Sequence, residues 1–419
     1  MREAMTRRRL IGLGGCLTVV MVVVVVLTVS GGAKTHGVPE GGSSFGAGAR
    51  AQGKRGGLMD ALAPVLAAGG GAPGAQAAGA QAAVGSSPEP DAAPGLPTSQ
   101  ARAAARLFLI GFGGPRVGDA VLKRFALHEW GGVVLEPGNG ASPQQVADVI
   151  GQLRGAAARA RHQAPLIAAS QLGGDQDAVP VGAPPQSQAA DAPAARAVAL
   201  GEAKAIHPLG VRMVLGPDAD IGFAGGPWEG VAFADDAQTV SDMTAAAVSG
   251  WKDGEVAAVP GHFPGEGAAS GDPALEAATV GLSLDELKAR DLKPFAAVAK
   301  HAPAMQLSAA TYVAWDGVTP ATLLPDVVKL LRHDLGFAGV IVSGDLQAAS
   351  LAGGEPVSAL AVDAIKAGVD LVWIPGDAAD QDAAWRAVVR ALRTGDIPAA
   401  RAADALKRVG LLRASYGVR

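Results

Sequence analysis

The sequence is poor in the residues that build disulfides, metal clusters and nucleic-acid surfaces. Its 419 residues include one cysteine, Cys16, which excludes an internal disulfide and a multi-cysteine zinc site. Basic residues cluster only at Arg7 to Arg9, which does not favour a nucleic-acid-binding protein. No candidate strand is followed by a complete G-x-G-x-x-G turn with its acidic partner, so no dinucleotide site is predicted. We expect no cofactor.

What the sequence does contain is apolar material. Hydrophobic residues make up 49% of the chain, and the formal net charge is −4. A chain of this length and composition can bury a large core and form one or two domains. The sequence does not indicate an oligomeric state.

The first 30 residues have the pattern of a membrane anchor. The basic residues 1–9 precede an uncharged run from Leu10 to Val29, which is long enough to cross the ~30 Å hydrocarbon core as a helix. The positive-inside rule keeps residues 1–9 in the cytoplasm, so we predict a single-pass anchor over 10–30 and an extracytoplasmic remainder. A cleaved signal peptide and a lipoprotein modified at Cys16 are the alternatives.

Residues 31–102 have the composition of a linker. Gly, Ala, Pro, Ser and Gln dominate this stretch, and such a segment cannot bury enough apolar surface to offset its chain entropy. We therefore predict a flexible tether that carries the folded part, residues 103–419, away from the membrane.

From residue 104 onward, short apolar runs alternate with stretches of helical spacing. Eight strands in this order predict an α/β fold, a (β/α)₈ TIM barrel, with a doubly wound open sheet as the alternative. Candidate helices lie at Pro143 to Ala160, Asp235 to Gly250, Leu284 to His301 and Pro325 to Leu335. The eight runs are RLFLIGFGG, GGVVLEPGN, PLIAASQLGG, VRMVLGPDAD, VAAVPGHFPG, AMQLSAATY, GVIVSGDL and LVWIPGD.

Function in such a barrel sits at the C-terminal ends of the strands. Carboxylates predominate there and suit glycoside hydrolysis, although acids at these positions also cap the following helices. A metal site is not predicted, because His262 is the one histidine at a strand end. The strand-end residues are Glu136, Ser170, Gln171, Asp218, Asp220, His262, Glu266, Ser308, Asp345 and Asp377.

Several of these segments carry a family resemblance. LGPDADI, GHFPGEG, PATLLPDVVKLLRHDLGFAGVIVSGDL and AIKAGVDLVWIP resemble the N-terminal barrel of glycoside hydrolase family 3. The likeness covers residues 104–419 and is greatest to the single-domain β-N-acetylhexosaminidases that trim cell-wall sugars. It implies a (β/α)₈ barrel and a saccharide site at the strand ends.

The residues that the family uses for chemistry are replaced in this chain. The resemblance places the nucleophilic aspartate at Gly344, the acid/base histidine at Ala274 beside Asp272, and the sugar-binding lysine at Gly261. Further polar positions of the family read as Ser170, Glu266, Val231 and Ser308. Because these positions are spread over several strand ends, one shift of alignment cannot restore them.

Two functional hypotheses follow. The first is a non-catalytic relative that binds a cell-wall saccharide, a peptidoglycan fragment or a partner protein through His262, Ser170, Trp228 and Asp220. Trp228 either stacks on a flat ligand or packs its own loop. The second is an active β-N-acetylhexosaminidase with relocated carboxylates. In that case Asp345, redirected by the glycine before it, is the nucleophile, and the acid is Glu266 or Asp272.

Overall fold

The computed structural model describes residues 99–418, and within that range no helix combines the length and the apolar character needed to span a bilayer. The predicted anchor over 10–30, the cytoplasmic residues 1–9 and nearly all of the predicted linker lie outside the described residues. The described part opens with Ser99, whose side chain caps helix α1 (Gln100–Ala105). Ala103, Ala104 and Ala105 are already buried in the core.

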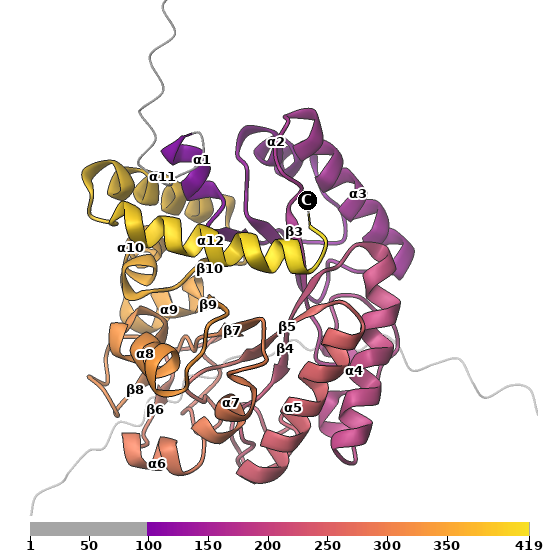
Figure 1. Cartoon of the computed structure of the whole chain (residues 1–419), viewed down its shortest axis with the longest axis vertical. Helices are drawn as coiled ribbons and strands as arrows, with labels where there is room; N and C mark the ends of the chain where they lie inside the picture. Colours follow the sequence, from indigo (N-terminus) through magenta and orange to yellow (C-terminus); the bar gives the residue numbers. More distant parts are fainter. Residues whose placement is uncertain (1–98, 419) are drawn as a thin grey trace, which may run out of the picture. The chain divides into compact units, whose positions relative to one another are not determined.

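Eight parallel strands form one barrel-like sheet (Figure 1). The order around the sheet is β5-β4-β3-β2-β1-β10-β9-β7. Its two edges meet at a parallel bridge between Phe263 and Leu307, just beyond β5 and β7. This arrangement is consistent with the predicted (β/α)₈ barrel. The strands are β1 (Phe108–Ile110), β2 (Gly132–Leu135), β3 (Leu166–Ser170), β4 (Met213–Asp218), β5 (Ala257–Gly261), β7 (Ala304–Gln306), β9 (Val340–Asp345) and β10 (Leu371–Ile374).

Helices follow the strands and surround the sheet (Figure 1). Their starts follow from capping residues: Ser142, Asp191 and Asp236 each accept a hydrogen bond from a backbone N–H of the first turn. The helices after α1 are α2 (Asp119–Leu127), α3 (Pro143–Arg159), α4 (Ala192–Ile206), α5 (Ala237–Asp253), α6 (Leu284–Ala289), α7 (Leu292–Val298), α8 (Pro325–Lys329), α9 (Leu346–Gly353), α10 (Val357–Ala367), α11 (Ala378–Thr394) and α12 (Ala399–Ser415).

Three predicted elements differ from the structure. The helix expected over Leu284 to His301 is divided into α6 and α7, because Pro294 has no N–H to bond the carbonyl of Arg290. The helix expected from Pro325 continues as a wider π turn, η5 (Leu330–Asp334). The strand expected over Ala304 to Tyr312 is divided into β7 and β8 (Thr311–Tyr312), and β8 pairs in parallel with β6 (Thr279–Val280), a short strand that the sequence did not predict.

Side chains alternate between two apolar layers along each strand. Leu109, Val134, Met213, Val259 and Val342 belong to the layer inside the barrel, whereas their chain neighbours pack against the helices. Leu412 of α12 joins the inner layer, so α12 covers the N-terminal end of the strands. The C-terminal end is thereby left as the mouth of the barrel.

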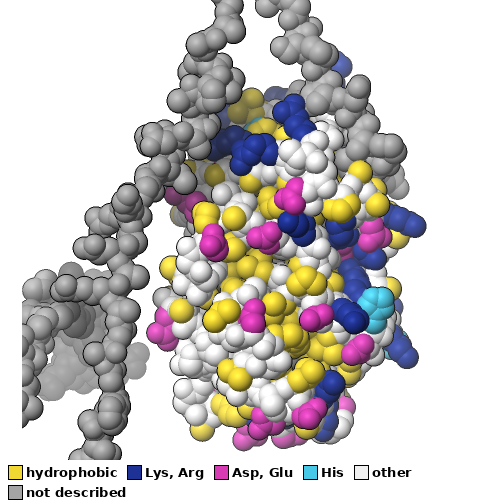
Figure 2. Space-filling model, turned by 90° about the vertical axis from the view of Figure 1, so that its left-hand side faces the viewer, with side chains coloured by type: hydrophobic (Ala, Val, Ile, Leu, Met, Phe, Trp, Pro, Cys, Tyr) yellow, Lys and Arg dark blue, Asp and Glu magenta, His cyan; other side chains and the backbone are white. Residues whose placement is uncertain are grey.

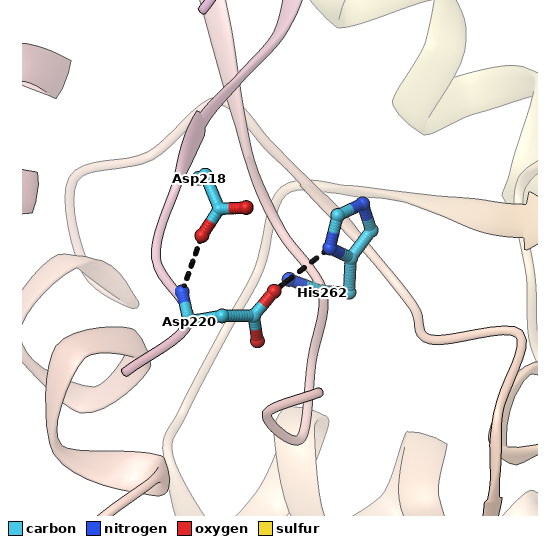
Figure 3. A group of neighbouring side chains, drawn as sticks. All are labelled: Asp218, Asp220 and His262. Atoms are coloured by element: carbon cyan, nitrogen blue, oxygen red, sulfur yellow. Dashed lines mark hydrogen bonds and ion pairs between the residues drawn. The ribbon is translucent and has the colours of Figure 1, made fainter. Parts of the chain in front are cut away.

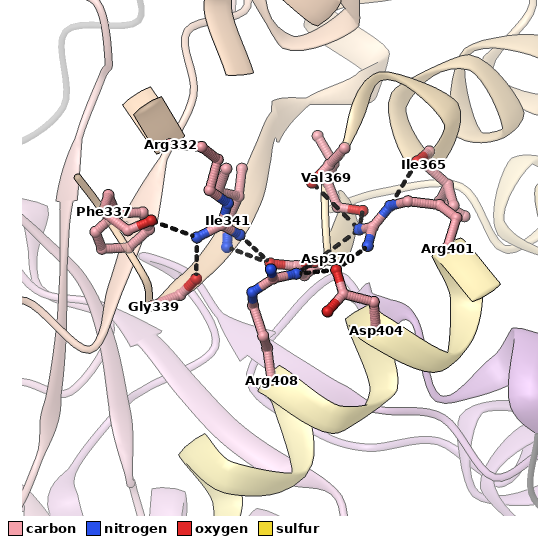
Figure 4. A network of polar contacts seen from close by, with 11 residues as sticks. Arg332, Phe337, Gly339, Ile341, Ile365, Val369, Asp370, Arg401, Asp404 and Arg408 are labelled. Carbon is pink, nitrogen blue, oxygen red and sulfur yellow. Dashed lines mark hydrogen bonds and ion pairs between the residues drawn. The ribbon is translucent and has the colours of Figure 1, made fainter. Parts of the chain in front are cut away.

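A buried ion-pair network holds α12 beneath the barrel (Figure 4). Asp370, immediately before β10, is fully buried and accepts hydrogen bonds from Arg332 and Arg401, each at 2.6 Å. Arg408 contacts the same carboxylate at 3.4 Å. On the face drawn in Figure 2, acidic, basic and apolar side chains are interspersed.

Candidate functional site

A cavity of about 240 Å³ lies at the mouth of the barrel. It brings together five residues that the sequence predicted for the site: Ser170, Asp218, Trp228, His262 and Asp272. Two larger grooves, of about 480 and 430 Å³, flank α12 at the opposite end. We take the mouth cavity as the candidate site because binding residues of such barrels stand at the C-terminal ends of the strands. Its other lining residues are Pro137, Leu172, Gln176, Leu215, Gly216, Pro217, Gly261, Ala274, Gln306 and Trp373.

Asp220 organises the wall of this cavity from within the core. Its carboxylate is fully buried; Oδ2 accepts hydrogen bonds from the backbone N–H of His262 at 3.2 Å and from Nδ1 of the same ring at 2.8 Å. Oδ1 accepts a hydrogen bond from the N–H of Glu266 at 2.5 Å. Asp220 therefore fixes both the loop after β5 and the direction of the His262 ring (Figure 3).

Glu266 is committed to the core rather than to the cavity. Its Oε1 accepts hydrogen bonds from the Ser308 hydroxyl at 2.5 Å and from the Ala309 N–H at 3.0 Å. Its Oε2 lies 3.6 Å from Nδ1 of His262. Burial raises the pKa of Glu266, while His262 opposes that rise. Glu266 thus connects the loops after β5 and β7.

The charge of His262 is set by competition between burial and its neighbours. Burial lowers the pKa of this imidazole, but Glu266, Asp220 and Asp218 outweigh it and raise the pKa to about 10. The ring is therefore an imidazolium at neutral pH. Trp228 stacks on it, with ring centroids 4.9 Å apart and planes at 27°, which is a favourable arrangement for a cation beside an indole.

Asp218, which precedes Asp220 by two residues, was a strand-end candidate whose partners the sequence did not reveal. It is 2% exposed, and its Oδ1 accepts a hydrogen bond from the Asp220 N–H at 2.8 Å. Its Oδ2 has no hydrogen-bond partner within residues 99–418. Burial, with Asp220 adding to it, raises the pKa of Asp218 well above its usual range. Asp218, Asp220 and His262 are the side chains here that could hold a metal ion.

Gly344 stands where backbone leaves no room for a side chain. A Cβ at this position would lie 2.8 Å from the N of Ala309 and 3.0 Å from the O of Leu307. Both atoms belong to main chain after β7, so a carboxylate at position 344 requires that loop to move. The place that the family resemblance assigns to the nucleophile is closed in this chain.

A bulge in β9 brings Asp345 into register with Trp373, although Asp345 is not among the residues that line the cavity. Val342 pairs with Leu371 and Asp345 pairs with Trp373, so β9 has one more residue than β10 over the same stretch. Since Trp373 lines the cavity, its register partner Asp345 lies on the same face of the sheet. Asp345 also caps α9, because its Oδ1 accepts hydrogen bonds from the N–H groups of Gln347 and Ala348.

The charge of Asp345 affects the pKa of a second acid, Glu136, at the end of β2. Burial raises the pKa of Glu136 to about 7, and the negative charge of Asp345 adds to that rise. Burial also raises the pKa of Asp345 to about 6. The sequence identified both acids but did not pair them, because β2 and β9 are separated in the barrel by β1 and β10.

The remaining predicted positions show no catalytic pair. Asp272 is half-buried, and its Oδ1 accepts a hydrogen bond from the N–H of Ala274 at 2.9 Å, which closes a local turn. Ala274 is exposed and offers no proton carrier. Ser170 is half-buried at the end of β3 and lines the cavity together with Gln306, a residue that no sequence pattern marked as functional.

Comparisons with known proteins agree with this fold. Residues 106–412 match the family model described as the glycosyl hydrolase family 3 N terminal domain. A beta-hexosaminidase of Stenotrophomonas maltophilia (strain K279a) is 34% identical over 259 residues, which are 58% of this chain and 75% of that protein.

Solved structures give the same assignment. A glycoside hydrolase family 3 beta-N-acetylglucosaminidase from Paenibacillus sp. str. FPU-7 superposes with a TM-score of 0.70 at 28% identity, over 76% of this chain and 62% of that chain. A beta-N-acetylhexosaminidase from Beutenbergia cavernae superposes with a TM-score of 0.69 at 26% identity, over 76% of this chain and 99% of that chain. The resemblance seen in the sequence is confirmed: the chain belongs to glycosyl hydrolase family 3.

Proposed function

We propose that this protein is a saccharide-binding member of glycosyl hydrolase family 3 that does not cleave glycosidic bonds. The observation that carries the proposal is the closure at Gly344, where a Cβ would meet the N of Ala309 at 2.8 Å. A family 3 nucleophile at this position needs room for a carboxylate that attacks the sugar. Neither the side chain nor the room is present.

The acid/base position supports the same reading. Ala274 stands where the family resemblance places the histidine, and the carboxylate of Asp272 is engaged by the N–H of Ala274 itself. Proton transfer to a leaving group needs a titratable side chain within hydrogen-bond reach. The acid/base pair that the family uses is therefore incomplete in this chain.

The mouth of the barrel offers side chains suited to binding a saccharide. The cavity combines an apolar ring, Trp228, with the charged His262 and the hydroxyl of Ser170, a mixture suited to a sugar that has one apolar face and many hydroxyls. The relatives named above are hexosaminidases, so we propose an N-acetylhexosamine as the bound unit. A cell-wall saccharide or peptidoglycan fragment is the proposed source.

The test combines turnover with binding. The purified full-length chain is incubated with a chromogenic N-acetyl-β-glucosaminide and titrated separately with N-acetylglucosamine oligomers. We expect binding without release of the chromophore. Trp228→Ala should abolish binding, whereas Leu127→Ala, a change at a 71% exposed side chain of α2, should leave it unchanged. Turnover by the wild-type chain, or binding that survives Trp228→Ala, would contradict the proposal.

One observation favours a second candidate, a hydrolase with relocated acids. The bulge in β9 turns Asp345 to the face of Trp373, and the charge of Asp345 raises the pKa of Glu136. An ionised acid beside a protonated one is the pairing that glycoside hydrolysis uses. Glu136 replaces Glu266 in this role, because Glu266 is held by Ser308 and Ala309. Turnover that is lost in both Asp345→Asn and Glu136→Gln would establish this candidate.

The predicted anchor and linker add a location to the proposal. Residues 10–30 would hold the protein in the cell membrane, and residues 31–102 would carry the barrel into the extracytoplasmic space. Protease treatment of intact and lysed cells tests this directly. Degradation of the barrel in intact cells is expected, and protection until lysis would reject the extracytoplasmic location.

A further inference from the structure

We propose that Asp218, Asp220 and His262 form a binding site for a divalent transition-metal ion such as Zn²⁺ in the wall of the mouth cavity. The three residues come from the ends of two neighbouring strands, β4 and β5, which pair in parallel as far as Asp218 and Gly261. The proposal does not depend on saccharide binding or on hydrolysis, although His262 is also one of the residues proposed to bind the saccharide.

The donor atoms are close enough to share one ion. Each residue offers one ligand atom, and the three atoms lie within 4.8 Å of one another. Zinc binds histidine nitrogen and carboxylate oxygen at about 2.0 to 2.2 Å, so two donors of one ion are at most about 4.4 Å apart. In a tetrahedral site the donors are about 3.3 to 3.6 Å apart. The most distant donors of the group drawn in Figure 3 must therefore approach by about 1 Å, and Nδ1 of His262 and Oδ2 of Asp220, now 2.8 Å apart, must separate slightly.

The unpartnered oxygen of Asp218 is evidence for a bound ligand. Asp218 is 98% removed from solvent, yet its Oδ2 has no hydrogen-bond partner within residues 99–418. Buried carboxylate oxygens are nearly always satisfied, because desolvation without a partner is costly. In Figure 3 this oxygen lies on the side of Asp218 that faces His262.

Asp218 is held in that orientation by its backbone. The side-chain amide of Gln186 accepts a hydrogen bond from the Asp218 N–H at 3.0 Å and donates one to the Asp218 carbonyl at 3.0 Å. Its Oδ1 is fixed by the Asp220 N–H. Because its backbone and one carboxylate oxygen are already fixed, Asp218 would lose little conformational entropy when its other oxygen binds an ion, which favours binding.

Charge balance also favours a cation. Asp218, Asp220 and Glu266 are each at most 2% exposed, and His262 is the one cation that forms an ion pair with any of them in the described part of the chain. Metal binding requires a neutral imidazole and ionised carboxylates, so any proton on His262 Nδ1 or on the Asp218 carboxyl leaves to solvent as the ion binds. The exchange replaces a charge of one by a charge of two among buried carboxylates.

The ligand set selects the class of ion. Calcium and magnesium prefer six or more oxygen donors, whereas one imidazole and two carboxylates match zinc and its neighbours among the transition metals. Asp218 and His262 both line the cavity, so we expect the fourth coordination position to face the mouth. That position is open to water or to a ligand hydroxyl.

The experiment measures metal binding by the purified full-length chain after removal of metal with a chelator. Titration with Zn²⁺ should give one tightly bound ion per chain. Asp218→Asn should weaken that binding at least about tenfold, the size of effect seen even for residues one shell away from a metal. Asp235→Asn, a matched change at an exposed acid before α5, should bind as the wild type does.

Melting curves show whether each variant is folded. Without metal, Asp218→Asn should melt at or above the wild-type temperature, because it replaces a buried unpaired carboxylate by a neutral amide. Zn²⁺ should raise the melting temperature of the wild type and of Asp235→Asn but not of Asp218→Asn. Should Asp218→Asn fail to fold, His262→Gln carries the same comparison. No stoichiometric uptake, or uptake unchanged in the folded site variants, overturns the proposal and leaves a proton on Asp218 as the occupant.

Discussion

Gly344 lies so close to Ala309 that a β-carbon on Gly344 would be only 2.8 Å from the amide nitrogen of Ala309. We therefore expect Gly344→Ala to destabilise the fold by about 1 to 3 kcal/mol, the usual cost of overpacking. Chemical denaturation measures the change.

Gly151→Ala is the control for this prediction. Gly151 lies in the middle of α3, and a Cβ there meets nothing within 4 Å. The substitution should stabilise the protein by about 0.5 to 1 kcal/mol, because alanine is the better helix former. Equal effects of the two substitutions would mean that the loop after β7 yields easily. In that case the fold could accommodate a carboxylate side chain at position 344.

The second prediction concerns a pair of acids beneath the loop after β3. Burial raises the pKa of Glu202 to about 8, and Asp177 adds to the rise. Since the folded protein holds the proton more tightly than an unfolded Glu near 4.3, stability falls as pH rises between about 4.3 and 8. Glu202→Gln, which keeps a neutral side chain at every pH, should remove much of this slope.

Unfolding free energies at pH 5 and pH 8 test this pair. The difference between the two pH values should shrink in Glu202→Gln by a few kcal/mol, roughly 1.4 kcal/mol for each unit of pKa difference between the folded and unfolded states. Asp175→Asn changes an exposed acid of the same loop and should keep the wild-type slope. An unchanged slope in Glu202→Gln would show that Glu202 is ionised in the folded protein.

The third prediction concerns His262. Its pKa of about 10 means that the ring stays an imidazolium at pH 8, where a free histidine is neutral. Folded-state stability from this ring is complete below the unfolded pKa near 6.5 and is lost as pH rises toward 10. NMR titration of the ring should show no transition between pH 6 and 8. Asp220→Asn should lower the pKa, since it removes the charge that Nδ1 contacts at 2.8 Å.

The sequence predicted the frame better than the site, and particular residues show why. An apolar run such as Val340 to Val342, ended by Gly or a polar residue, is a local pattern that can be seen without knowing its neighbours in space. The sequence therefore predicted all eight strands of the barrel. The close approach of Gly344 to Ala309 joins β9 to the loop after β7, and no local sequence pattern predicts it. The bulge that turns Asp345 to the face of Trp373 is likewise a matter of register between β9 and β10.

The fourth prediction separates the capping role of Asp345 from its charge. Asp345→Ala removes both hydrogen bonds to the first turn of α9 and should cost about 1 kcal/mol, whereas Asp345→Asn keeps a capping oxygen and should cost less. Both substitutions should lower the pKa of Glu136 from about 7, because they remove the charge that raises it. Carboxyl NMR of Glu136 measures this. A pKa of Glu136 that is the same in all three proteins would show that the two acids do not interact.

The last prediction addresses the end of the barrel opposite the mouth. Asp370 is fully buried and lies 2.6 Å from both Arg332 and Arg401, which are themselves mostly buried. Asp370→Asn leaves these guanidinium groups without their counter-charge, and breaking a buried pair in this way costs about 3 to 5 kcal/mol. Asp404→Asn, at a 48% exposed acid that pairs with Arg401 and Arg408 on α12, should cost at most about 1 kcal/mol. Denaturation midpoints compare the two variants.

Because α12 covers the N-terminal end of the barrel and the cavity opens at the C-terminal end, saccharide binding by folded Asp370→Asn should match the wild type. A loss of binding without a loss of stability would mean that this network shapes the mouth rather than the closed end of the barrel.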